Sequence, residues 1–424
     1  MGGTCFNTAV ATGGPGRMDR EQDVTRDRRG YRALLASALI SGVGFGATTP
    51  VQALFVKSLG ATTAVAGLLV GVIGGARILA NLPSGLLSGQ FGFRPVIVLG
   101  GLLRALGLLL WGVSRSVPPL YPASLAVGFG GALRWTACLA AVPAVTSPSS
   151  RGRAMSGFLS CDLIGFGLGP ILGGYLAERY GLHVPFVVSF FTETAAAAII
   201  LLWFLQARSR EGDAASRGPL LWAGVSSLLR NQAFLAIAGL QFGYAFVSMA
   251  IVGTLGPLIG ATRAGLTTSQ IGASMTAGSV LMIVAINFSG RQLDRRQGRP
   301  VVIVGVAAAC AALFLMSRSR SLVSFTVAFL PLMVGGGLVA PVAPAYAAAM
   351  AAGGQGAITM GLLQTVGELG YFSGPALLGL LTDLAGGRFE PALSCCAGLL
   401  LIVGAFFAVS ERRPAQNRRG DGSC

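Results

Sequence analysis

The chain has 424 residues, of which 53% are hydrophobic and only 11% charged, and it contains 63 glycines. Soluble globular domains carry about 25% charged residues, so this chain cannot cover itself with a polar surface, and we expect its solvent to be lipid. Its net charge of +16 could suggest a nucleic-acid partner, but the basic residues lie between apolar segments, so the charge indicates membrane topology instead.

Twelve apolar segments follow one another along the chain, each long enough for a helix that crosses a bilayer, which takes about 20 residues. They cover about residues 33–55, 64–84, 96–113, 119–142, 155–177, 184–206, 232–260, 267–288, 301–317, 322–347, 357–383 and 391–409. The longest polar connection separates two groups of six spans. The predicted organisation is a disordered tail (1–32), a six-helix bundle (33–206), a central loop (207–231), a second six-helix bundle (232–409) and a second tail (410–424).

The distribution of basic residues predicts which side of the membrane holds the termini. An even number of spans places both termini on one side, and the connections on that side carry 21 of the 31 basic residues, against seven on the other. The remaining three, Arg77, Arg104 and Arg134, lie inside spans. Because cytoplasmic loops are enriched in basic residues, we expect both termini in the cytoplasm and a multi-pass protein of the cytoplasmic (inner) membrane of a bacterium.

Neither metal chemistry nor nucleotide hydrolysis is expected. The seven cysteines form no CxxC pair, and the only histidine is His183, so the cysteines are interpreted as small apolar residues of the spans. The chain also lacks the phosphate-binding pattern GxxxxGK[ST]. We therefore predict a membrane protein without a cofactor, and not an enzyme.

The two groups of spans repeat each other at a constant offset of 205 residues. Residues 85–100, GLLSGQFGFRPVIVLG, align with residues 290–305, GRQLDRRQGRPVVIVG. The same offset places Gly130, Gly131 and Leu133 on Gly335, Gly336 and Leu338. One offset that holds in separate regions predicts two homologous bundles.

Glycine and proline are concentrated in the fifth span, GFGLGPILGG, although glycine costs a helix about 1 kcal/mol and proline about 3. In lipid, small residues at four-residue spacing let two helix backbones approach closely, and proline favours a bend. We predict that this span and its repeat in the eleventh are bent helices with closely packed interfaces. The residues concerned are Gly165, Gly169, Pro170, Gly173 and Gly174, and then Gly370, Gly374 and Pro375.

With these motifs the sequence resembles the major facilitator superfamily, and more narrowly its drug:proton antiporter branch, over essentially the whole membrane region. The resemblance implies an all-α membrane protein with twelve transmembrane helices in two pseudo-symmetric six-helix bundles. The fifth span matches the motif G-x-x-x-G-P-x-x-G-G of exporters. In this fold the fifth and eleventh helices meet partners from the opposite bundle, so the resemblance implies that the glycine-rich segments slide against that bundle. A second motif, G-x-L-x-D-R-x-G-R-R, is a cytoplasmic loop, although Gly89 stands where its first aspartate is expected. It is matched by Gly85, Gly92 and Arg94, and then by Gly290, Asp294, Arg295, Gly298 and Arg299.

Carboxylic acids inside spans are candidates for proton coupling, because an ionisable group costs about 2.5 to 3.5 kcal/mol to insert. Glu368 lies near the middle of the eleventh span, in a half without an arginine in any span. A buried carboxyl group without a partner holds a proton more tightly than one in water, so Glu368 is the first candidate and Asp162 the second. Alternatively, Glu368 only shapes helix packing. Glu193, in the sixth span, is expected to form a structural pair.

The three arginines inside spans and Asp162 lie at similar depth, which predicts a polar site with surplus positive charge. Arg134 is the best candidate for a contact with an anionic or polar substrate. Under the alternative interpretation, the arginines extend towards lipid phosphates while Asp162 pairs with one of them. Other candidates for substrate contacts, for which ordinary helix packing is the alternative, are Gln52, Gln241, Tyr244, Tyr346 and Gln364.

We therefore predict a monomeric secondary active transporter that works by alternating access around a site between its halves. The favoured activity is antiport, namely efflux of a small organic or drug-like molecule driven by the proton gradient. The alternatives are an importer or exchanger of an organic anion or nutrient, and a transport-inactive membrane receptor or assembly factor. The expected partners are the lipid bilayer, a small-molecule substrate and protons.

Overall fold

The protein is almost entirely helical. The computed structural model describes residues 17–146, 151–206, 228–295, 298–350 and 356–410, and no strand occurs in these ranges. The N-terminal half consists of α1 (Arg17–Thr48), α2 (Gln52–Ser58), α3 (Thr63–Phe91), α4 (Phe93–Val113), α5 (Leu120–Ala144), α6 (Arg151–Tyr180) and α7 (Val184–Gln206). The C-terminal half consists of α9 (Gln232–Ala250), η2 (Ile251–Leu255), α10 (Gly256–Thr262), α11 (Thr268–Asp294), α12 (Gly298–Met316), α13 (Leu322–Val339), α14 (Val342–Met350), α15 (Gly356–Leu384) and α16 (Glu390–Ser410).

The helices have the lengths of membrane spans. Within the described residues, eleven helical stretches are long and apolar enough to cross a membrane. The helix α15, with 29 residues, completes the predicted set of twelve, and the protein is a multi-pass membrane protein. Residues 1–16, 207–227 and 411–424, from the predicted tails and central loop, lie outside the described residues. Residues 17–32, predicted as part of a disordered tail, instead belong to the helix α1.

Three of the predicted spans are not continuous α-helices. The first is interrupted after α1, next to Pro50, and the tenth is divided at Pro341 between α13 and α14. Proline has no backbone N–H and cannot continue the hydrogen bonds of the preceding helix, so the interruptions follow from the sequence. The seventh passes through the wider turn η2 shortly before Pro257.

The repeat predicted from the sequence is present in three dimensions. An offset of 205 residues relates the helices of the first half to those of the second, so that α3 corresponds to α11 and α6 to α15. Equivalent residues make equivalent contacts. Ser84 Oγ donates a hydrogen bond to the carbonyl oxygen of Leu133 at 3.0 Å, and Ser289 Oγ donates to that of Leu338 at 2.7 Å. The predicted pair of homologous bundles is confirmed.

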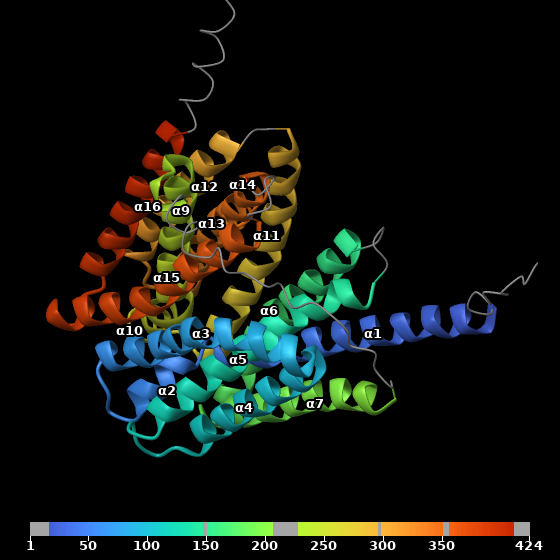
Figure 1. Ribbon diagram of the computed structural model, residues 1–424. Coiled ribbons are helices and arrows are strands. Elements are labelled where there is room, and N and C mark those ends of the chain that lie inside the picture. Colours follow the sequence, from blue (N-terminus) through green and yellow to red (C-terminus); the bar gives the residue numbers. More distant parts are fainter. Residues whose placement is uncertain (1–16, 147–150, 207–227, 296–297, 351–355, 411–424) are drawn as a thin grey trace, which may run out of the picture.

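The two halves meet through α3 with α15 and through α6 with α11, as expected for the fifth and eleventh spans. We call the end of the bundles where these contacts concentrate the closed side, and the end where α1 begins and α16 ends the termini side. At the closed side, Thr268 Oγ1 donates a hydrogen bond to the carbonyl oxygen of Gly174 at 2.9 Å. Towards the termini side the halves diverge (Figure 1). A Cβ atom added there at Gly85 or Gly290 would meet nothing within 4 Å.

The apolar core differs between the halves. The C-terminal half has one cluster of buried hydrophobic residues that extends from α9 to α16. The N-terminal half has two, one that includes Ile97 and Trp203 towards the termini side and one that includes Leu108 and Trp111 towards the closed side. On α4, the residue between these two clusters is the buried Arg104. Polar groups therefore divide the core of the N-terminal half.

Candidate functional site

An ion pair joins the two halves at the contact between α3 and α15. Arg77 Nε lies 2.8 Å from Glu368 Oε1, and the two side chains are 27% and 9% exposed. The second carboxylate oxygen, Glu368 Oε2, is buried and accepts no hydrogen bond from any described residue. Buried polar atoms without a partner are uncommon in native proteins. This oxygen is thus available to a proton or to a ligand group.

The expectation that Glu368 has no charged partner is wrong. No arginine lies in a span of its own half, but Arg77 approaches it from the other half, 291 positions away in the sequence. Glycines on α3 make this approach possible. A Cβ atom at Gly71 would lie 2.5 Å from the carbonyl oxygen of Phe372, and one at Gly74 would lie 2.9 Å from its nitrogen. These glycines were not predicted as part of the site, although their spacing along α3 resembles that of the fifth span.

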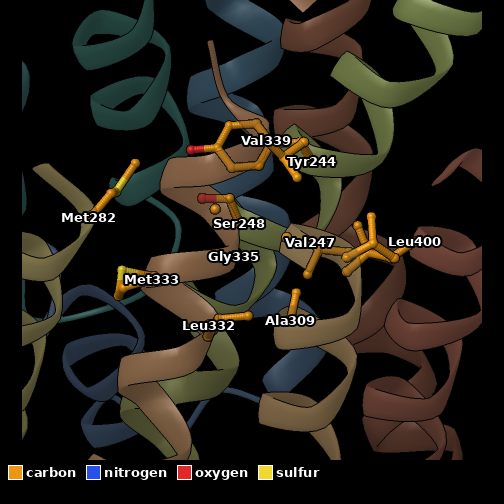
Figure 2. A pocket seen from close by; sticks show the side chains of 13 residues that line it. Tyr244, Val247, Ser248, Met282, Ala309, Leu332, Met333, Gly335, Val339 and Leu400 are labelled. Carbon is orange, nitrogen blue, oxygen red and sulfur yellow. The ribbon is translucent and has the colours of Figure 1, made fainter. Parts of the chain in front are cut away.

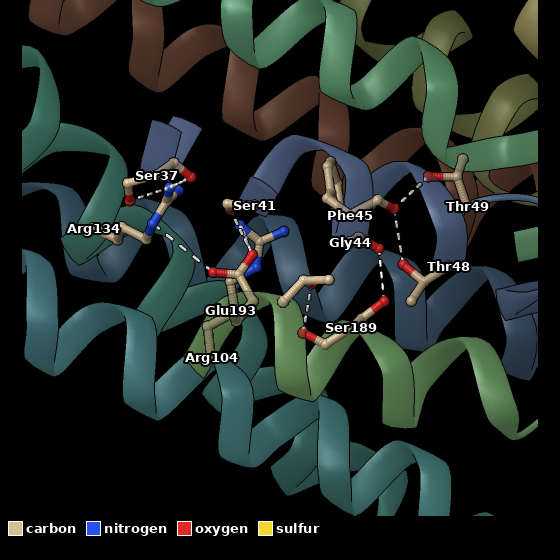
Figure 3. Close-up of polar contacts among 11 residues, drawn as sticks. Ser37, Ser41, Gly44, Phe45, Thr48, Thr49, Arg104, Arg134, Ser189 and Glu193 are labelled. Carbon is tan, nitrogen blue, oxygen red and sulfur yellow. Dashed lines mark hydrogen bonds and ion pairs between the residues drawn. The ribbon is translucent and has the colours of Figure 1, made fainter. Parts of the chain in front are cut away.

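A second ionic group lies inside the N-terminal half (Figure 3). Glu193 on α7 is fully buried. Its Oε1 lies 3.3 Å from Arg104 Nη1, and its Oε2 lies 3.8 Å from Arg134 Nε. Ser41 Oγ donates a hydrogen bond to Oε1 at 2.6 Å. The expectation that Glu193 forms a structural pair is met.

Arg134 does not face the opening between the halves. Its side chain is only 2% exposed, and its Nη2 donates a hydrogen bond to the carbonyl oxygen of Ser37 at 2.9 Å. Arg104 is also buried, with its guanidinium 4.7 Å from the centre of the Phe45 ring. Both side chains are directed into the N-terminal half, because Glu193 offers the compensation that a buried charge requires. The prediction of Arg134 as a substrate contact gains no support from this geometry.

The predicted surplus of positive charge is also wrong. Asp162 is half-buried on α6, and no described ion pair includes it, but it lies within electrostatic range of all three arginines. With the two glutamates included, the described cluster holds as many carboxylates as arginines. Its members are Arg77, Arg104, Arg134, Asp162, Glu193 and Glu368.

Two of the other predicted contacts lie beside Glu368, and a third lies deeper inside the same half. Gln241 on α9 faces the adjacent Gly367, where a Cβ atom would lie 2.9 Å from its Nε2. Gln364 is exposed, one helical turn before Glu368 on the same face. Tyr244 lines a cavity of about 30 Å³ inside the C-terminal half, together with Met282 and Met333 (Figure 2). Gln241 and Gln364 thus place amide groups beside Glu368, while the cavity at Tyr244 lies inside the C-terminal half.

The remaining two predicted contacts lie elsewhere. Gln52 is buried in α2, towards the closed side. The ring of Tyr346 packs on Phe407, with 5.5 Å between the ring centres, and its hydroxyl lies against Gly298 inside the C-terminal half. One residue was missed by the sequence analysis. Tyr371, one turn after Glu368, is within electrostatic range of that carboxylate and of Arg77.

The glycine-rich part of α6 has two faces with different partners. Added Cβ atoms at Gly165, Gly169 and Gly173 would clash with backbone atoms of α1, in the same half. The carbonyl oxygen of Pro170 and the position of Gly174 instead face α11 of the opposite half. The prediction that the whole motif slides against the opposite bundle is therefore wrong for the first three glycines. The reason is helix geometry. Residues four apart, such as Gly169 and Gly173, share a face, whereas Pro170 and Gly174 each follow one position later and lie about 100° around the helix.

The counterpart on α15 follows the same division. A Cβ atom at Gly370 would lie 2.6 Å from the carbonyl oxygen of Phe242 on α9, and Gly374 also faces α9. The carbonyl oxygen of Pro375 instead lies against Gly67 on α3, in the other half. Close packing within each half and between the halves thus comes from different faces of one helix.

Two carboxylates cross from one half to the other at the closed side. Asp383, at the end of α15, accepts hydrogen bonds from the backbone N–H groups of Thr63 (3.1 Å) and Ala64 (2.6 Å), where α3 begins. Glu178, at the end of α6, accepts one from the N–H of Ser269 (3.1 Å), where α11 begins. The offset of 205 residues relates one contact to the other. Because a helix N-terminus carries partial positive charge and free N–H groups, both contacts stabilise the closed arrangement.

The loop motif lies at the termini side. Gly92, between α3 and α4, has a φ of +83°, which a residue with a side chain rarely adopts. The guanidinium of Arg94 lies 4.1 Å from the centre of the Trp203 ring. Asp294 and Arg295 are exposed where α11 ends, and Arg299 follows in α12. No described ion pair includes Asp294.

These features define a membrane transporter built from two pseudo-symmetric halves, and not an enzyme. The chain belongs to the Major Facilitator Superfamily, which its sequence matches over residues 34–329 and 242–423. It is 24% identical to Multidrug resistance protein 2 of Bacillus subtilis over 396 residues, which cover 91% of this chain and 95% of that one. It is 25% identical to the class B tetracycline resistance protein of Escherichia coli over 331 residues, 76% and 79% of the two chains.

A solved structure has the same fold. A bacterial homologue of the human lysosomal transporter Spinster, in an inward-facing and unoccupied conformation, gives a TM-score of 0.75 at 15% identity. The match covers 91% of this chain and 97% of that one. At this identity the similarity establishes the fold and no more.

Proposed function

We propose that the protein exports a small organic molecule across the inner membrane of a bacterium in exchange for protons, which Glu368 carries. The observation that carries the proposal is the ion pair of this carboxylate with Arg77, 2.8 Å long, where the two halves meet. Relatives named for multidrug and tetracycline resistance over most of the chain support efflux. By the excess of basic residues, the termini side is the cytoplasmic one, so the protein is open to the cytoplasm here.

The pair links the charge of Glu368 to the arrangement of the halves. In the present arrangement the Arg77 guanidinium lies 2.8 Å from Glu368 Oε1, so Glu368 has a cation as its partner in place of the proton, which leaves towards the cytoplasm. A substrate that enters from the cytoplasm and binds Glu368 Oε2 competes with Arg77 and weakens the contact between α3 and α15. Once the site faces outwards, a proton neutralises the carboxylate and the substrate leaves. Each charge that moves down a potential of 100 mV supplies about 2.3 kcal/mol.

Exchange of an organic anion is less well supported. It was suggested by a surplus of arginines, but Arg104 and Arg134 are buried and share Glu193. Only Arg77 is exposed enough to meet a substrate, and it already has an acidic partner. A site of balanced charge suits a neutral or cationic molecule better.

Transport into everted membrane vesicles tests the proposal. With an acidic lumen, we expect uptake of a cationic dye coupled to release of protons. In the variant Glu368→Gln, uptake should fall to the level of vesicles without the protein. The matched control is Glu390→Gln, which removes a carboxylate from a pair of similar length with Arg263 (2.7 Å) on the surface. That variant should transport normally.

Three other outcomes would contradict the proposal. Uptake of organic anions that does not depend on the pH gradient would support an exchanger of organic anions. Uptake of neither probe would support a transport-inactive receptor. Full proton-coupled transport by Glu368→Gln would remove Glu368 from the mechanism.

A further inference from the structure

A groove of about 280 Å³ lies between α1 and α7 at the termini side of the N-terminal half. It is separate from the site between the halves, and nothing in the proposed transport mechanism uses it. The groove is lined by Arg29, Arg32, Ala33, Ile199, Leu202 and Trp203. Its walls differ in chemistry, one being basic and the other apolar.

The basic wall carries two arginines without an acidic neighbour in the lining. Arg29 and Arg32 are three residues apart on α1, so they lie on the same face of the helix. Both are exposed, and none of the described ion pairs includes either. A guanidinium group can donate two parallel hydrogen bonds to a phosphate, so two of them on one face suit a phosphate group.

The indole of Trp203 supplies a donor that lacks an acceptor. The residue is 7% exposed, and its Nε1 is buried without a hydrogen-bond partner among the described residues. Buried tryptophan N–H groups usually find a partner. The ring is fixed by Arg94, 4.1 Å away on one side, and by the close approach of Gly30. The unused N–H requires a hydrogen-bond acceptor, and the two arginines favour an acceptor group that carries negative charge.

The apolar wall continues onto the outer surface of α7. Leu202 is 58% exposed, although it is a large hydrophobic residue, and Ile199 is half-buried one turn away. In a chain whose solvent is lipid, such residues face acyl chains. Basic side chains and an aromatic N–H near the end of a span, next to an apolar surface, match the two parts of a phospholipid.

In the sequence of the C-terminal half, the positions equivalent to the two arginines and the tryptophan of the groove hold apolar residues. The offset of 205 residues places Phe234, Ile237 and Ala408 at the positions of Arg29, Arg32 and Trp203. The helices α9 and α16 therefore pack in the same way without arginines. This indicates that the fold does not require the basic wall, and a specific ligand would explain it.

We propose that this groove binds an anionic phospholipid of the leaflet on the termini side. Arg29 and Arg32 contact the phosphate, Trp203 Nε1–H donates to a phosphate or ester oxygen, and an acyl chain lies along Ile199 and Leu202. The proposal holds whether or not the protein is a proton-coupled exporter, since all these residues belong to one half and none lies at the proposed transport site.

Native mass spectrometry of the full-length protein tests it, with titration of phosphatidylglycerol and, separately, phosphatidylcholine of equal chain length. We expect tighter binding of phosphatidylglycerol, and a loss of affinity of about tenfold or more in the double variant Arg29→Gln/Arg32→Gln. The double variant Arg318→Gln/Arg320→Gln is the control, because it removes two exposed arginines at the opposite side. Trp203→Phe, which keeps an aromatic side chain and removes the N–H, should weaken binding about two- to tenfold. This variant also tests the proposal if the double variant does not fold.

The proposal is overturned if the double variant binds phosphatidylglycerol like the unchanged protein, or if both lipids bind equally well. Competition by millimolar inorganic phosphate alone would mean that the groove is a site for the free anion and not for a lipid. Because binding is measured without transport, these results are independent of the vesicle experiment.

Discussion

In the N-terminal half, Arg104 and Arg134 share the buried carboxylate of Glu193. The equivalent positions of the C-terminal half, in the same order, are Ala309, Val339 and Gly398. Arg77 likewise corresponds to Met282. Where the first half holds charges, the second half holds the small cavity, about 30 Å³, that Met282, Ala309 and Val339 help to line. The two bundles thus share helix positions and differ in the chemistry of their centres.

This difference shows that the fold does not depend on buried ions. Replacing a buried ion group by apolar residues is often neutral or stabilising, and the C-terminal half packs without one. The distribution of charged residues between the halves also bears on the coupling of transport to protons. The carboxylate proposed to carry the proton, Glu368, belongs to the apolar half, while its partner Arg77 belongs to the ionic half. Their pair therefore responds to the relative position of the halves.

The largest effect that tests this comparison is expected from Glu193→Gln. The variant keeps the size of the side chain but removes the carboxylate with which two buried arginines pair, which should cost about 3 to 5 kcal/mol of stability. We expect a strongly lowered melting temperature in detergent, or loss of the folded protein. The measurement is thermal unfolding followed by fluorescence, together with gel filtration.

Glu390→Gln serves as the control for this variant. Its carboxylate is 47% exposed and pairs with Arg263 at the surface, so its removal should change stability by less than about 1 kcal/mol. Equal melting temperatures for the two variants would show that the ionic centre of the N-terminal half is not structurally important, and the contrast between the halves would lose its meaning.

The spans and the repeat were predictable because both appear directly in the sequence, the spans as apolar segments and the repeat as a constant offset between similar segments. A span requires about 20 apolar residues, and the offset of 205 survives in segments such as residues 85–100 and 290–305. The depth of the charged residues in the membrane was predictable as well, since each residue of a helix adds about 1.5 Å along its axis. Arg134 accordingly lies in the predicted ionic cluster.

Directions around the helix axes and partners from the other half could not be predicted. The spacing of Gly165, Gly169 and Gly173 places them on one face, but not against a particular neighbour, and their neighbour is α1 of the same half. For the same reason, Arg134 was expected to face a substrate. The partner of Glu368 depends on how two bundles approach each other, which no local pattern encodes.

Where the two halves meet, equivalent positions of the two halves have the same chemistry. Variants at positions related by the offset of 205 residues should therefore have similar effects. A Cβ atom at Gly67 would overlap the carbonyl oxygen of Pro375, and one at Gly272 would overlap that of Pro170. Both clashes are with the opposite half. We expect Gly67→Ala and Gly272→Ala to leave each half folded and to lower the population of the closed arrangement at least about tenfold, since 1.4 kcal/mol suffices for this.

Spin labels at Ser58 and Thr262, one on each half at the closed side, measure that population as a distance distribution. The control is Gly398→Ala, where an added Cβ meets nothing within 4 Å, and it should leave the distribution unchanged. A large effect of Gly67→Ala without a comparable effect of Gly272→Ala would mean that the halves do not contribute equally to closure.

The smallest effects are expected from the carboxylates at the closed side, and here the two halves should differ again. Asp383 accepts two backbone N–H groups of the opposite half, whereas Glu178 accepts one. A helix cap contributes about 1 kcal/mol, which exposure to solvent reduces, so Asp383→Ala should lower the closed population about threefold. Glu178→Ala should lower it less, because this residue is exposed and its contribution is screened by salt.

The same spin labels detect both changes, and Asp294→Ala at the termini side is the control. Since the two contacts share no residue, their effects should add in the double variant Glu178→Ala/Asp383→Ala. A larger effect of Glu178→Ala than of Asp383→Ala would contradict the order derived from the hydrogen bonds. An effect of the double variant well above the sum would show that the two contacts close cooperatively, so that the pseudo-symmetric ends of α6 and α15 act as one unit.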